Sequence, residues 1–216
     1  YPGRLIVVEG TDGAGRSTQV ALLREWLESH GFAVAHTALT RSRLAAEGLQ
    51  KAKQGHTLSH LTMDLLYATD FADRLDNFIL PALRGGFVVL TDRYIYSTMA
   101  RSIVRGGDPQ WIRDVYQFAP RPHAVFHLKI DLEYLIPRVL ARGGFDYWES
   151  GMDCQGENDI YRSFRQYQDR LLRVFDELAE EYDLRVVDAN LPVRQVYQTL
   201  KDGILEVVST MTGARV

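Results

Sequence analysis

The sequence is poor in cysteine and in long apolar runs. Its one cysteine, Cys154, cannot form a disulfide within the chain, and no cysteine cluster points to a zinc or iron–sulfur site. The longest apolar runs, such as Leu5–Val8 and Phe87–Leu90, fall far short of the roughly 20 residues that span a bilayer. The start of the chain also has no signal-peptide pattern. We therefore expect a cytoplasmic protein with no membrane partner.

The sequence also lacks an excess of either charge. Its 25 Lys and Arg residues are nearly balanced by 28 Asp and Glu residues, which gives a net charge of −3. A general basic field that attracts nucleic acid is therefore missing, and we expect no nucleic-acid partner. Internal repeats, linkers and low-complexity tracts are absent as well. The 216 residues, 46% of them hydrophobic, predict a single domain over residues 1–216.

Short β-rich runs alternate along the chain with stretches of helical periodicity. This alternation predicts an α/β fold with about five parallel strands, flanked by helices and binding its ligand at the carboxyl edge of the sheet. The least regular stretch, Gly143–Asp159, is expected to be a mobile loop or lid. The predicted strands are Arg4–Glu9, Phe32–Thr37, Phe87–Thr91, Ala124–Ile130 and Arg185–Val187. The predicted helices are Ser17–His30, Leu58–Leu83 with a break near Pro81, Ser163–Tyr182 and Pro192–Thr210.

A glycine-rich turn, GTDGAGRST at residues 10–18, lies between the first strand and the first helix. It matches the phosphate-binding pattern G-x-x-x-x-G-K-[ST], with Arg16 in place of lysine. Glycines let successive backbone N–H groups point at phosphate oxygens, and the helix N-terminus adds its dipole. Arg16 is expected to reach the β- and γ-phosphates, and Ser17 to ligate Mg²⁺. Such a turn can be a purely structural connection, but its context favours a nucleotide site formed by Gly10, Gly13, Ala14, Gly15, Arg16, Ser17 and Thr18.

A second polar pair follows the apolar strand at residues 87–91. In a parallel sheet, Asp92 lies at the carboxyl edge beside the glycine-rich turn, where a carboxylate can organise Mg²⁺ or orient an acceptor. Arg93 is suited to gripping a second phosphate with both arms of its guanidinium. The pair could also be a surface ion pair at a strand end, but its position beside a phosphate turn favours function.

Four blocks of sequence, in a fixed order, cover nearly the whole chain. They are VVEGTDGAGRSTQ (7–19), LLYATDFADRLDNFILPALRGGFVVLTDRYIYST (65–98), RPHAVFHLKID (121–131) and VVDANLPVRQV (186–196). Together they resemble the thymidylate kinase family of nucleoside monophosphate kinases, and the resemblance implies a P-loop NTPase fold. The blocks look like the family's P-loop strand, its central helix and Asp-Arg-Tyr motif, the strand before its lid, and its closing strand.

The resemblance implies that ATP, with Mg²⁺, donates its γ-phosphoryl group to a nucleoside monophosphate, with dTMP giving dTDP as the first choice. It implies that Tyr67 stacks on the acceptor base and that Arg93 holds the acceptor phosphate. Asp92 is then expected near Mg²⁺ and the acceptor. Asp12 is expected to face the incoming phosphate or sugar, and Ser97 to line the same pocket. A homodimer formed through helices flanking the Asp-Arg-Tyr strand is also implied.

The sequence departs from the family where the base is chosen. Phe71 stands where the family has an arginine on the thymine edge, and it takes that place in the expected acceptor pocket. The usual Arg-Glu-Pro-Gly stretch is replaced by TALTRSR at residues 37–43. The sequence therefore supports a monophosphate kinase better than it supports any one acceptor.

The lid, expected at approximately residues 138–160, departs from the family as well. Tyr147 replaces an arginine that points at the phosphates, and an extended segment, WESGMDCQGE, occupies residues 148–157. Arg138 is expected to contact ATP and Arg142 to clamp the transferred phosphoryl group. The residues expected to act in catalysis are Asp12, Arg16, Asp92 and Arg142.

Two alternatives remain open from the sequence. The altered base pocket allows a related kinase with another nucleoside or nucleotide as its acceptor. Arg16 and Tyr147 allow a nucleotide-binding regulator with weakened catalysis.

Overall fold

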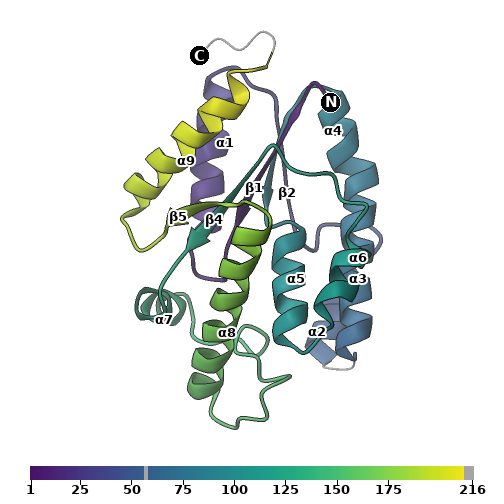
Figure 1. Cartoon of the computed structure of the whole chain (residues 1–216), viewed down its shortest axis with the longest axis vertical. Helices are drawn as coiled ribbons and strands as arrows, with labels where there is room; N and C mark the ends of the chain where they lie inside the picture. The colour runs from purple at the N-terminus through teal and green to yellow at the C-terminus, as the bar shows by residue number, and fades with distance from the viewer. Residues whose placement is uncertain (56–57, 212–216) are drawn as a thin grey trace.

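A computed structural model describes residues 1–55 and 58–211 (Figure 1). Its centre is a sheet of five parallel strands in the order β2-β3-β1-β4-β5. This arrangement confirms the predicted α/β class and the five-stranded parallel sheet. The strands are β1 (Arg4–Glu9), β2 (Val34–Ala38), β3 (Val88–Asp92), β4 (Ala124–Lys129) and β5 (Arg185–Asp188).

Helices cover both faces of this sheet, as Figure 1 shows. The predicted long helices are present, and the structure adds α2, α5, α6 and α7, of which α2 is short and buries only Leu49 and Ala52. The α-helices are α1 (Arg16–Ser29), α2 (Ala46–Gly55), α3 (His60–Arg74), α4 (Leu80–Arg84), α5 (Ile95–Val104), α6 (Pro109–Val115), α7 (Leu132–Ala141), α8 (Ile160–Glu181) and α9 (Val193–Val208). None of those described is long and apolar enough to cross a membrane.

Alternation along β1 builds two cores, one on each side of the sheet. Leu5 and Val7 face a core completed by α3, α5 and α8, whereas Ile6 and Val8 face one completed by α1 and α9. All four of these side chains are fully buried. Because β1 is central and covered on both faces, its sequence is a continuous apolar run. The carboxyl end of β1 is therefore held rigidly where the glycine-rich turn begins.

The helical region from His60 to Arg84 is continuous, and its irregularity precedes Pro81. Residues Leu75–Ile79 form a π turn, in which the N–H of Leu80 bonds to the carbonyl of Leu75, five residues back. Pro81 then follows as the second residue of α4. Because the helix is continuous there, its missing N–H leaves one carbonyl of the preceding turn without an intrahelical donor. The break predicted near Pro81 is thus a widened turn just before it, and the chain does not leave the helix.

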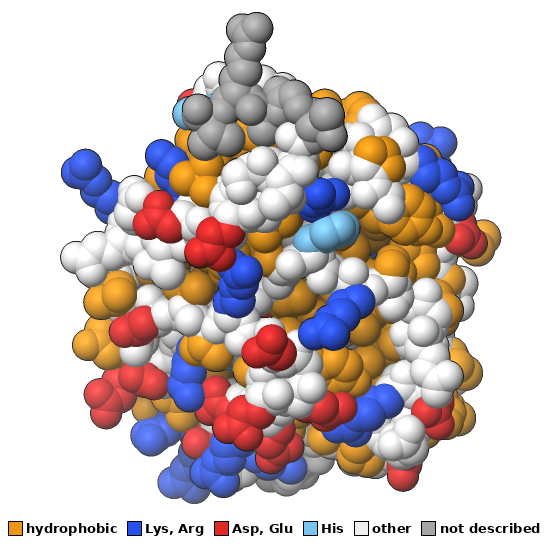
Figure 2. All heavy atoms as spheres, turned by 45° about the horizontal axis from the view of Figure 1, so that its top comes forward, with side chains coloured by type: hydrophobic (Ala, Val, Ile, Leu, Met, Phe, Trp, Pro, Cys, Tyr) orange, Lys and Arg blue, Asp and Glu red, His pale blue; other side chains and the backbone are white. Residues whose placement is uncertain are grey.

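Charged side chains of both signs are interspersed with apolar ones on the face seen in Figure 2. That face therefore carries no extended field of one sign, which agrees with the small net charge of −3.

Candidate active site

The glycine-rich turn curls at the carboxyl end of β1. Gly10, Gly13 and Gly15 have φ angles of 142°, 92° and 95°, a region that residues with side chains rarely adopt. A Cβ at Gly10 would lie 2.9 Å from the carbonyl oxygen of Leu128, so the strand next to β1 also requires glycine there. Gly15 is the N-cap of α1 and has no side chain to bond the first-turn amides. Those amides are left to bind an anion.

Arg16 folds back over the turn and does not extend away from it. Its Nη1 donates to the carbonyl of Gly10 at 2.6 Å and to that of Thr11. Its Nε donates to Oδ1 of Asp92 at 2.7 Å. The side chain is only 8% exposed. Arg16 therefore ties the turn to the end of β3, using several edges of its guanidinium at once.

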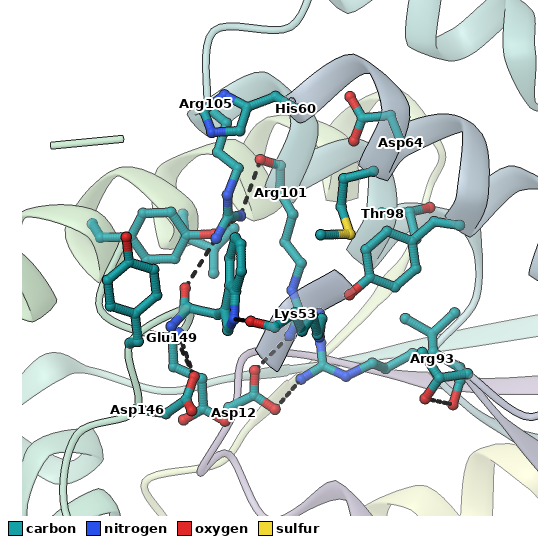
Figure 3. A pocket seen from close by; sticks show the side chains of 18 of the residues that line it. Asp12, Lys53, His60, Asp64, Arg93, Thr98, Arg101, Arg105, Asp146 and Glu149 are labelled. Atoms are coloured by element: carbon teal, nitrogen blue, oxygen red, sulfur yellow. Dashed lines mark hydrogen bonds and ion pairs between the residues drawn. The ribbon is translucent and has the colours of Figure 1, made fainter. Parts of the chain in front are cut away.

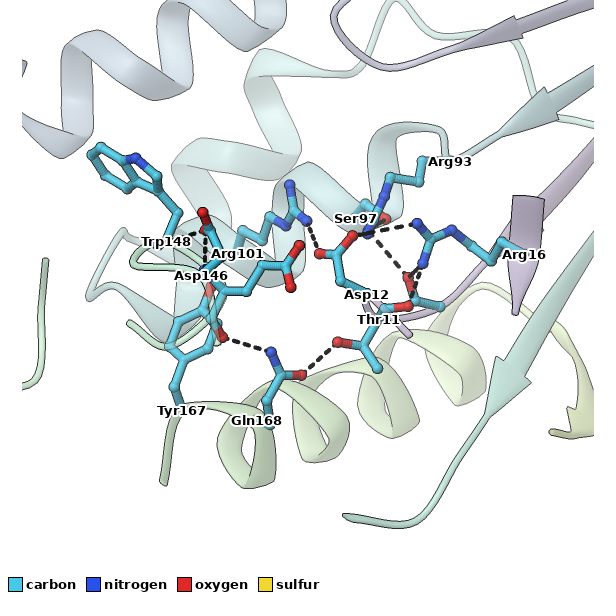
Figure 4. A network of polar contacts seen from close by, with 12 residues as sticks. Thr11, Asp12, Arg16, Arg93, Ser97, Arg101, Asp146, Trp148, Tyr167 and Gln168 are labelled. Atoms are coloured by element: carbon cyan, nitrogen blue, oxygen red, sulfur yellow. Dashed lines mark hydrogen bonds and ion pairs between the residues drawn. The ribbon is translucent and has the colours of Figure 1, made fainter. Parts of the chain in front are cut away.

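Asp12 is surrounded by three arginines from three parts of the chain (Figure 4). It accepts from Nη2 of Arg93 and from Nη2 of Arg101, the latter at 2.6 Å, and it lies 3.5 Å from Nη2 of Arg16. Burial by itself would raise the pKa of Asp12, but the three guanidinium groups hold that pKa well below its ordinary value. One carboxylate thus offsets part of a cluster of three positive charges.

Arg93 has a strained backbone, with a φ of 76°. Its N–H donates to the carbonyl of Val8, and its Nη1 donates to Ser97 Oγ at 2.9 Å and to the carbonyl of Gly10 at 3.1 Å. Burial and the charge of Arg16 lower the pKa of Arg93 to about 10, which leaves it protonated at neutral pH. These contacts aim its guanidinium across the turn.

Beneath Arg93 lies a fully buried carboxylate, Glu9. It accepts from the N–H of Tyr94 at 2.7 Å, from the N–H of Ser97 at 3.2 Å, and from the Ser97 hydroxyl. Burial raises the pKa of Glu9. Glu9 therefore fixes the first turn of α5 to the end of β1. Ser97, held by Glu9, in turn accepts from Arg93 and helps to fix its guanidinium.

A cavity of about 570 Å³ opens beside the arginine cluster (Figure 3). Its polar end is formed by Asp12, Arg16, Asp92, Arg93 and Arg101. Away from these residues it is lined by Leu58, Met63, Tyr67 and Trp148, with the polar side chains of Lys53, His60, Asp64 and Thr98 among them. A cationic end joined to an apolar slot suits a ligand that has a phosphate at one end and a flat apolar ring at the other.

The cavity and the turn together have the form of a site for two phosphorylated ligands. The family model for thymidylate kinase matches residues 8–200. The chain belongs to the thymidylate kinase family. A probable thymidylate kinase 2 of Saccharolobus solfataricus is 36% identical to it over 90% of this chain and 92% of its own length. A probable thymidylate kinase of Thermococcus kodakarensis is 31% identical (96% and 98%), and a thymidylate kinase of Trichodesmium erythraeum is 30% identical (94% and 96%). This family member is thus a nucleoside monophosphate kinase with the P-loop NTPase fold.

The residues expected to hold magnesium lie together in this kinase. Ser17 Oγ donates to Oδ2 of Asp92 at 3.0 Å. These are hard oxygen donors of the kind Mg²⁺ prefers, and Mg²⁺ takes its other ligands from water and phosphate. Within residues 1–55 and 58–211, no group of three or more His, Cys, Asp or Glu side chains could hold a metal. The donor set therefore fits a magnesium ion shared with a nucleotide, and Ser17 and Thr18 are exposed toward such a ligand.

Of the residues predicted to bind the acceptor, some line the cavity and others are buried in the core. Tyr67 lines the cavity, but Phe71 does not: its ring packs edge-on against Tyr94 and Tyr116 in the core and is 1% exposed. The expectation that Phe71 contacts the acceptor base is therefore not supported. Phe71 lies on nearly the same side of α3 as Tyr67, one turn further along, but at that level the helix packs against Tyr94 and Tyr116 and not against the cavity. Ser97, which was expected to line the pocket, does not line the cavity either: it is fully buried beneath Arg93, from which it accepts a hydrogen bond.

The two arginines expected in the lid bond to groups other than the glycine-rich turn. Arg138 of α7 donates to the carbonyl of Ala189, just after β5, at 3.0 Å. Arg142 ends α7 and pairs with Glu149. Neither guanidinium forms a hydrogen bond with the described residues of the glycine-rich turn. A clamping role for either remains a prediction.

Several cavity residues were missed by the sequence reasoning, although one signal could have found two of them. Arg101 and Arg105 are spaced by four residues on α5 and its end, so they share the helix face that looks into the cavity. Gln168 of α8 gave no such signal. It is 1% exposed, accepts from the Thr11 hydroxyl, and donates from Nε2 to the carbonyl of Glu149 at 2.8 Å (Figure 4).

Proposed function

We propose that this kinase transfers the γ-phosphoryl group of ATP to dTMP, giving ADP and dTDP. The observation that carries the proposal is the continuity between the glycine-rich turn and the cavity, with Asp12 and Arg93 at their junction. The turn is suited to the triphosphate, and the cavity has the size and polarity for a nucleoside monophosphate.

In this proposal the chain acts by positioning and by placing positive charge. Arg93 and Arg101 hold the acceptor phosphate at the polar end of the cavity, and Tyr67 contacts the base at the other. Asp12 keeps the arginines apart and aimed. Bound Mg²⁺, held by Ser17 and Asp92 with the nucleotide phosphates, supplies neutralising charge.

Arg16 reaches both sides of the proposed reaction. It lies between Asp12 and Asp92, and it lines the cavity. We expect its guanidinium to offset the charge that develops on the transferred group, with Arg16 exchanging a loop carbonyl for a phosphate oxygen.

A second candidate is the same transfer to a different nucleoside monophosphate. It is favoured by Phe71, which leaves no arginine at that position to contact a thymine edge. The polar side chains near the apolar end, Lys53, His60 and Asp64, form a different set of donors and acceptors.

A panel assay tests the proposal. ADP release from ATP–Mg²⁺ is measured with each ribo- and deoxynucleoside monophosphate, and we expect dTMP to give the highest kcat/KM. Gly15→Val, which places a branched side chain at a φ of 95°, should abolish ATP binding and all turnover. Turnover that is fastest with another monophosphate selects the second candidate. ATP binding unchanged by Gly15→Val contradicts the assignment of the turn.

We also propose that the kinase forms a homodimer through α3 and the π turn. Leu61 and Leu65 of α3 and Phe78 of the π turn are exposed at 57%, 46% and 40%, and they lie on the helical region that leads into β3. Leu61 and Leu65 lie one turn apart on the same face of α3, and exposed apolar side chains of this size indicate an interaction site. Sedimentation equilibrium should give twice the monomer mass, and Leu65→Glu should shift it toward the monomer. A monomeric wild-type chain at micromolar concentration contradicts this.

A further inference from the structure

Three consecutive backbone carbonyls hold the segment after α7 against the body of the protein. The carbonyl of Trp148 accepts from Arg105 Nη2 at 2.9 Å, that of Glu149 from Gln168 Nε2 at 2.8 Å, and that of Ser150 from the Ser163 hydroxyl at 2.8 Å. Arg105 extends α5, while the other two donors are on α8. A segment fixed through its backbone in this way presents its side chains at set positions, so residues 146–153 form a wall.

Further contacts strengthen this wall. Arg105 Nε donates to Asp153 at 2.7 Å, and its Nη1 bonds to the Tyr167 hydroxyl. Gly151 has a φ of 64°, and a Cβ there would lie 2.4 Å from the Tyr167 ring. The backbone of the segment therefore sits directly on α8. Asp146 accepts from the N–H groups of Trp148 and Glu149, which closes the turn at its start.

The indole of Trp148 is the part of this wall that meets the cavity. Its Nε1 donates to the carbonyl of Lys53, on α2, at 3.1 Å. Its ring packs against the small apolar cluster that contains Met63 and Tyr67. Trp148, Met63 and Tyr67 all line the cavity. Figure 3 shows Lys53 and Glu149 among the residues around this space, together with Arg101 and Arg105 from α5 and its end. The apolar end of the cavity is thus bounded by the segment after α7 as well as by α3.

We propose that Trp148 is a specificity-determining residue for the acceptor, that it forms the base slot together with Tyr67 and Met63, and that Arg105 positions it. The inference rests on the proposed function, because it takes the occupant of the cavity to be a nucleoside monophosphate. The slot accepts a flat base, whose stacking on an aromatic wall strengthens binding about ten-fold or more. Because the indole is fixed from both sides, it limits the size of that base.

Trp148→Ala and Trp148→Phe test the slot directly. Steady-state kinetics with Trp148→Ala should raise the KM for the acceptor about ten-fold or more and leave the KM for ATP within about two-fold. Trp148→Phe, which keeps an aromatic wall, should have a smaller effect. Trp148→Ala should also narrow the discrimination between pyrimidine and purine monophosphates, because the slot becomes larger. Trp111→Phe on α6 is the matched control and should change neither KM.

Tryptophan fluorescence provides a readout that does not depend on turnover. The chain has three tryptophans, Trp26, Trp111 and Trp148. Adding the acceptor monophosphate without ATP should change the emission of the wild type and of Trp111→Phe. The change should be lost in Trp148→Phe. Thermal melting and ATP binding of each variant establish that it is folded.

Asp153→Asn tests the positioning role of Arg105 without removing the arginine. It weakens the pair at 2.7 Å, so the acceptor KM should rise by a few-fold while kcat and the ATP KM stay near wild type. Arg105→Lys should have a kinetic effect similar to that of Asp153→Asn, because the lysine keeps the positive charge but lacks the planar guanidinium that makes several hydrogen bonds at once.

The outcomes separate this inference from the proposed function. If dTMP is inactive but another monophosphate binds and depends on Trp148, the inference stands and the choice of dTMP fails. If dTMP is phosphorylated while Trp148→Ala leaves its KM unchanged, the inference is wrong and the function stands. Equal increases in the KM values for donor and acceptor, or a fluorescence change retained in Trp148→Phe, also overturn the inference.

Discussion

At position 16, a guanidinium makes contacts that a lysine ammonium cannot reproduce together. Arg16 bonds to Asp92 through Nε and to two loop carbonyls through Nη1. A lysine would supply one point charge in place of this planar fork. The arginine is therefore built into the shape of the turn, and its environment includes the carboxylates that a lysine would also meet.

We accordingly expect Arg16→Lys to lower kcat/KM about ten-fold or more, through the loss of at least one charged hydrogen bond worth about 1.5–3 kcal/mol. Steady-state ADP release measures this change. Arg24→Lys, in an exposed pair with Glu28 on the same helix, is the control and should be neutral. A rate that rises in Arg16→Lys contradicts the expectation and indicates a site weakened by arginine.

The carboxylate of Asp12 offsets charges that otherwise repel. Asp12→Asn leaves Arg16, Arg93 and Arg101 without their shared anion, so the empty protein should lose about 3–5 kcal/mol of stability. Inorganic phosphate should then stabilise the variant more than it stabilises the wild type, because it replaces the missing negative charge. Thermal melts with and without phosphate measure both effects. Asp176→Asn, which removes an exposed partner of Lys129, is the control; equal phosphate shifts in Asp12→Asn and wild type would rule the idea out.

Among elements, α8 connects the glycine-rich turn to the segment after α7 through one side chain. Gln168→Leu removes the bonds to the Thr11 hydroxyl and the Glu149 carbonyl and leaves both groups buried without that partner. We expect faster amide hydrogen exchange in residues 10–15 and 146–151 together, and a loss of about 2 kcal/mol in stability. Hydrogen exchange followed by mass spectrometry measures this. Gln166→Leu, exposed on the same helix, should leave both regions unchanged. Faster exchange in only one of the two regions argues against the connection.

Elements with strong local patterns could be predicted, whereas their contacts could not. The strand β1, the turn after it and α1 follow from a run of apolar residues, three glycines and a helical period. The helix α2 is short and buries only Leu49 and Ala52, so its position depends on packing against α3. Phe71 was misplaced for a similar reason: its chemistry suits a base or a core equally, and only the neighbouring Tyr94 and Tyr116 decide between them.

In the candidate site, too, the residues in short motifs could be predicted, whereas those brought together by tertiary contacts could not. Arg16, Asp92 and Arg93 lie within or beside short motifs, and sequence spacing was enough to bring them to one edge. The far wall of the cavity combines residues from α2, α3, α5, α8 and the segment after α7. Trp148 and Lys53 are 95 positions apart and meet through one indole hydrogen bond. No local periodicity predicts a contact of that kind.

At the scale of the whole molecule, stability should fall in mild acid because of one buried histidine. His127 on β4 is fully buried and stacks on Phe175 at 4.9 Å, and burial lowers its pKa to about 4. The unfolded chain has an ordinary histidine pKa of about 6.5. Between these values the unfolded state binds the proton and the folded state does not. The contribution of neutral His127 to the free energy of unfolding is therefore fully present above about pH 6.5, and it is lost as the pH falls toward 4.

From these two pKa values we expect His127 to account for a loss of about 2 kcal/mol between pH 7.5 and pH 5. Urea unfolding at the two pH values measures the total change. His127→Phe keeps an aromatic ring beside Phe175 and should remove this share, so the comparison isolates the histidine. His30→Gln, at an exposed helix end, should leave the pH dependence as it is. An unchanged pH dependence in His127→Phe would show that the acid sensitivity arises elsewhere.

The π turn at Leu75–Ile79 has a consequence for insertions and deletions in this fold. A π turn accommodates one residue more than the α turn that it replaces, while the helix on either side keeps its facing. A version of the chain that is one residue shorter between Leu75 and Ile79, and that has no proline at position 81, can therefore close into an ordinary α-helix and still direct Phe71 and Leu83 into the same core. This turn is where the longest helical region of the molecule can change its residue count without changing what it packs against.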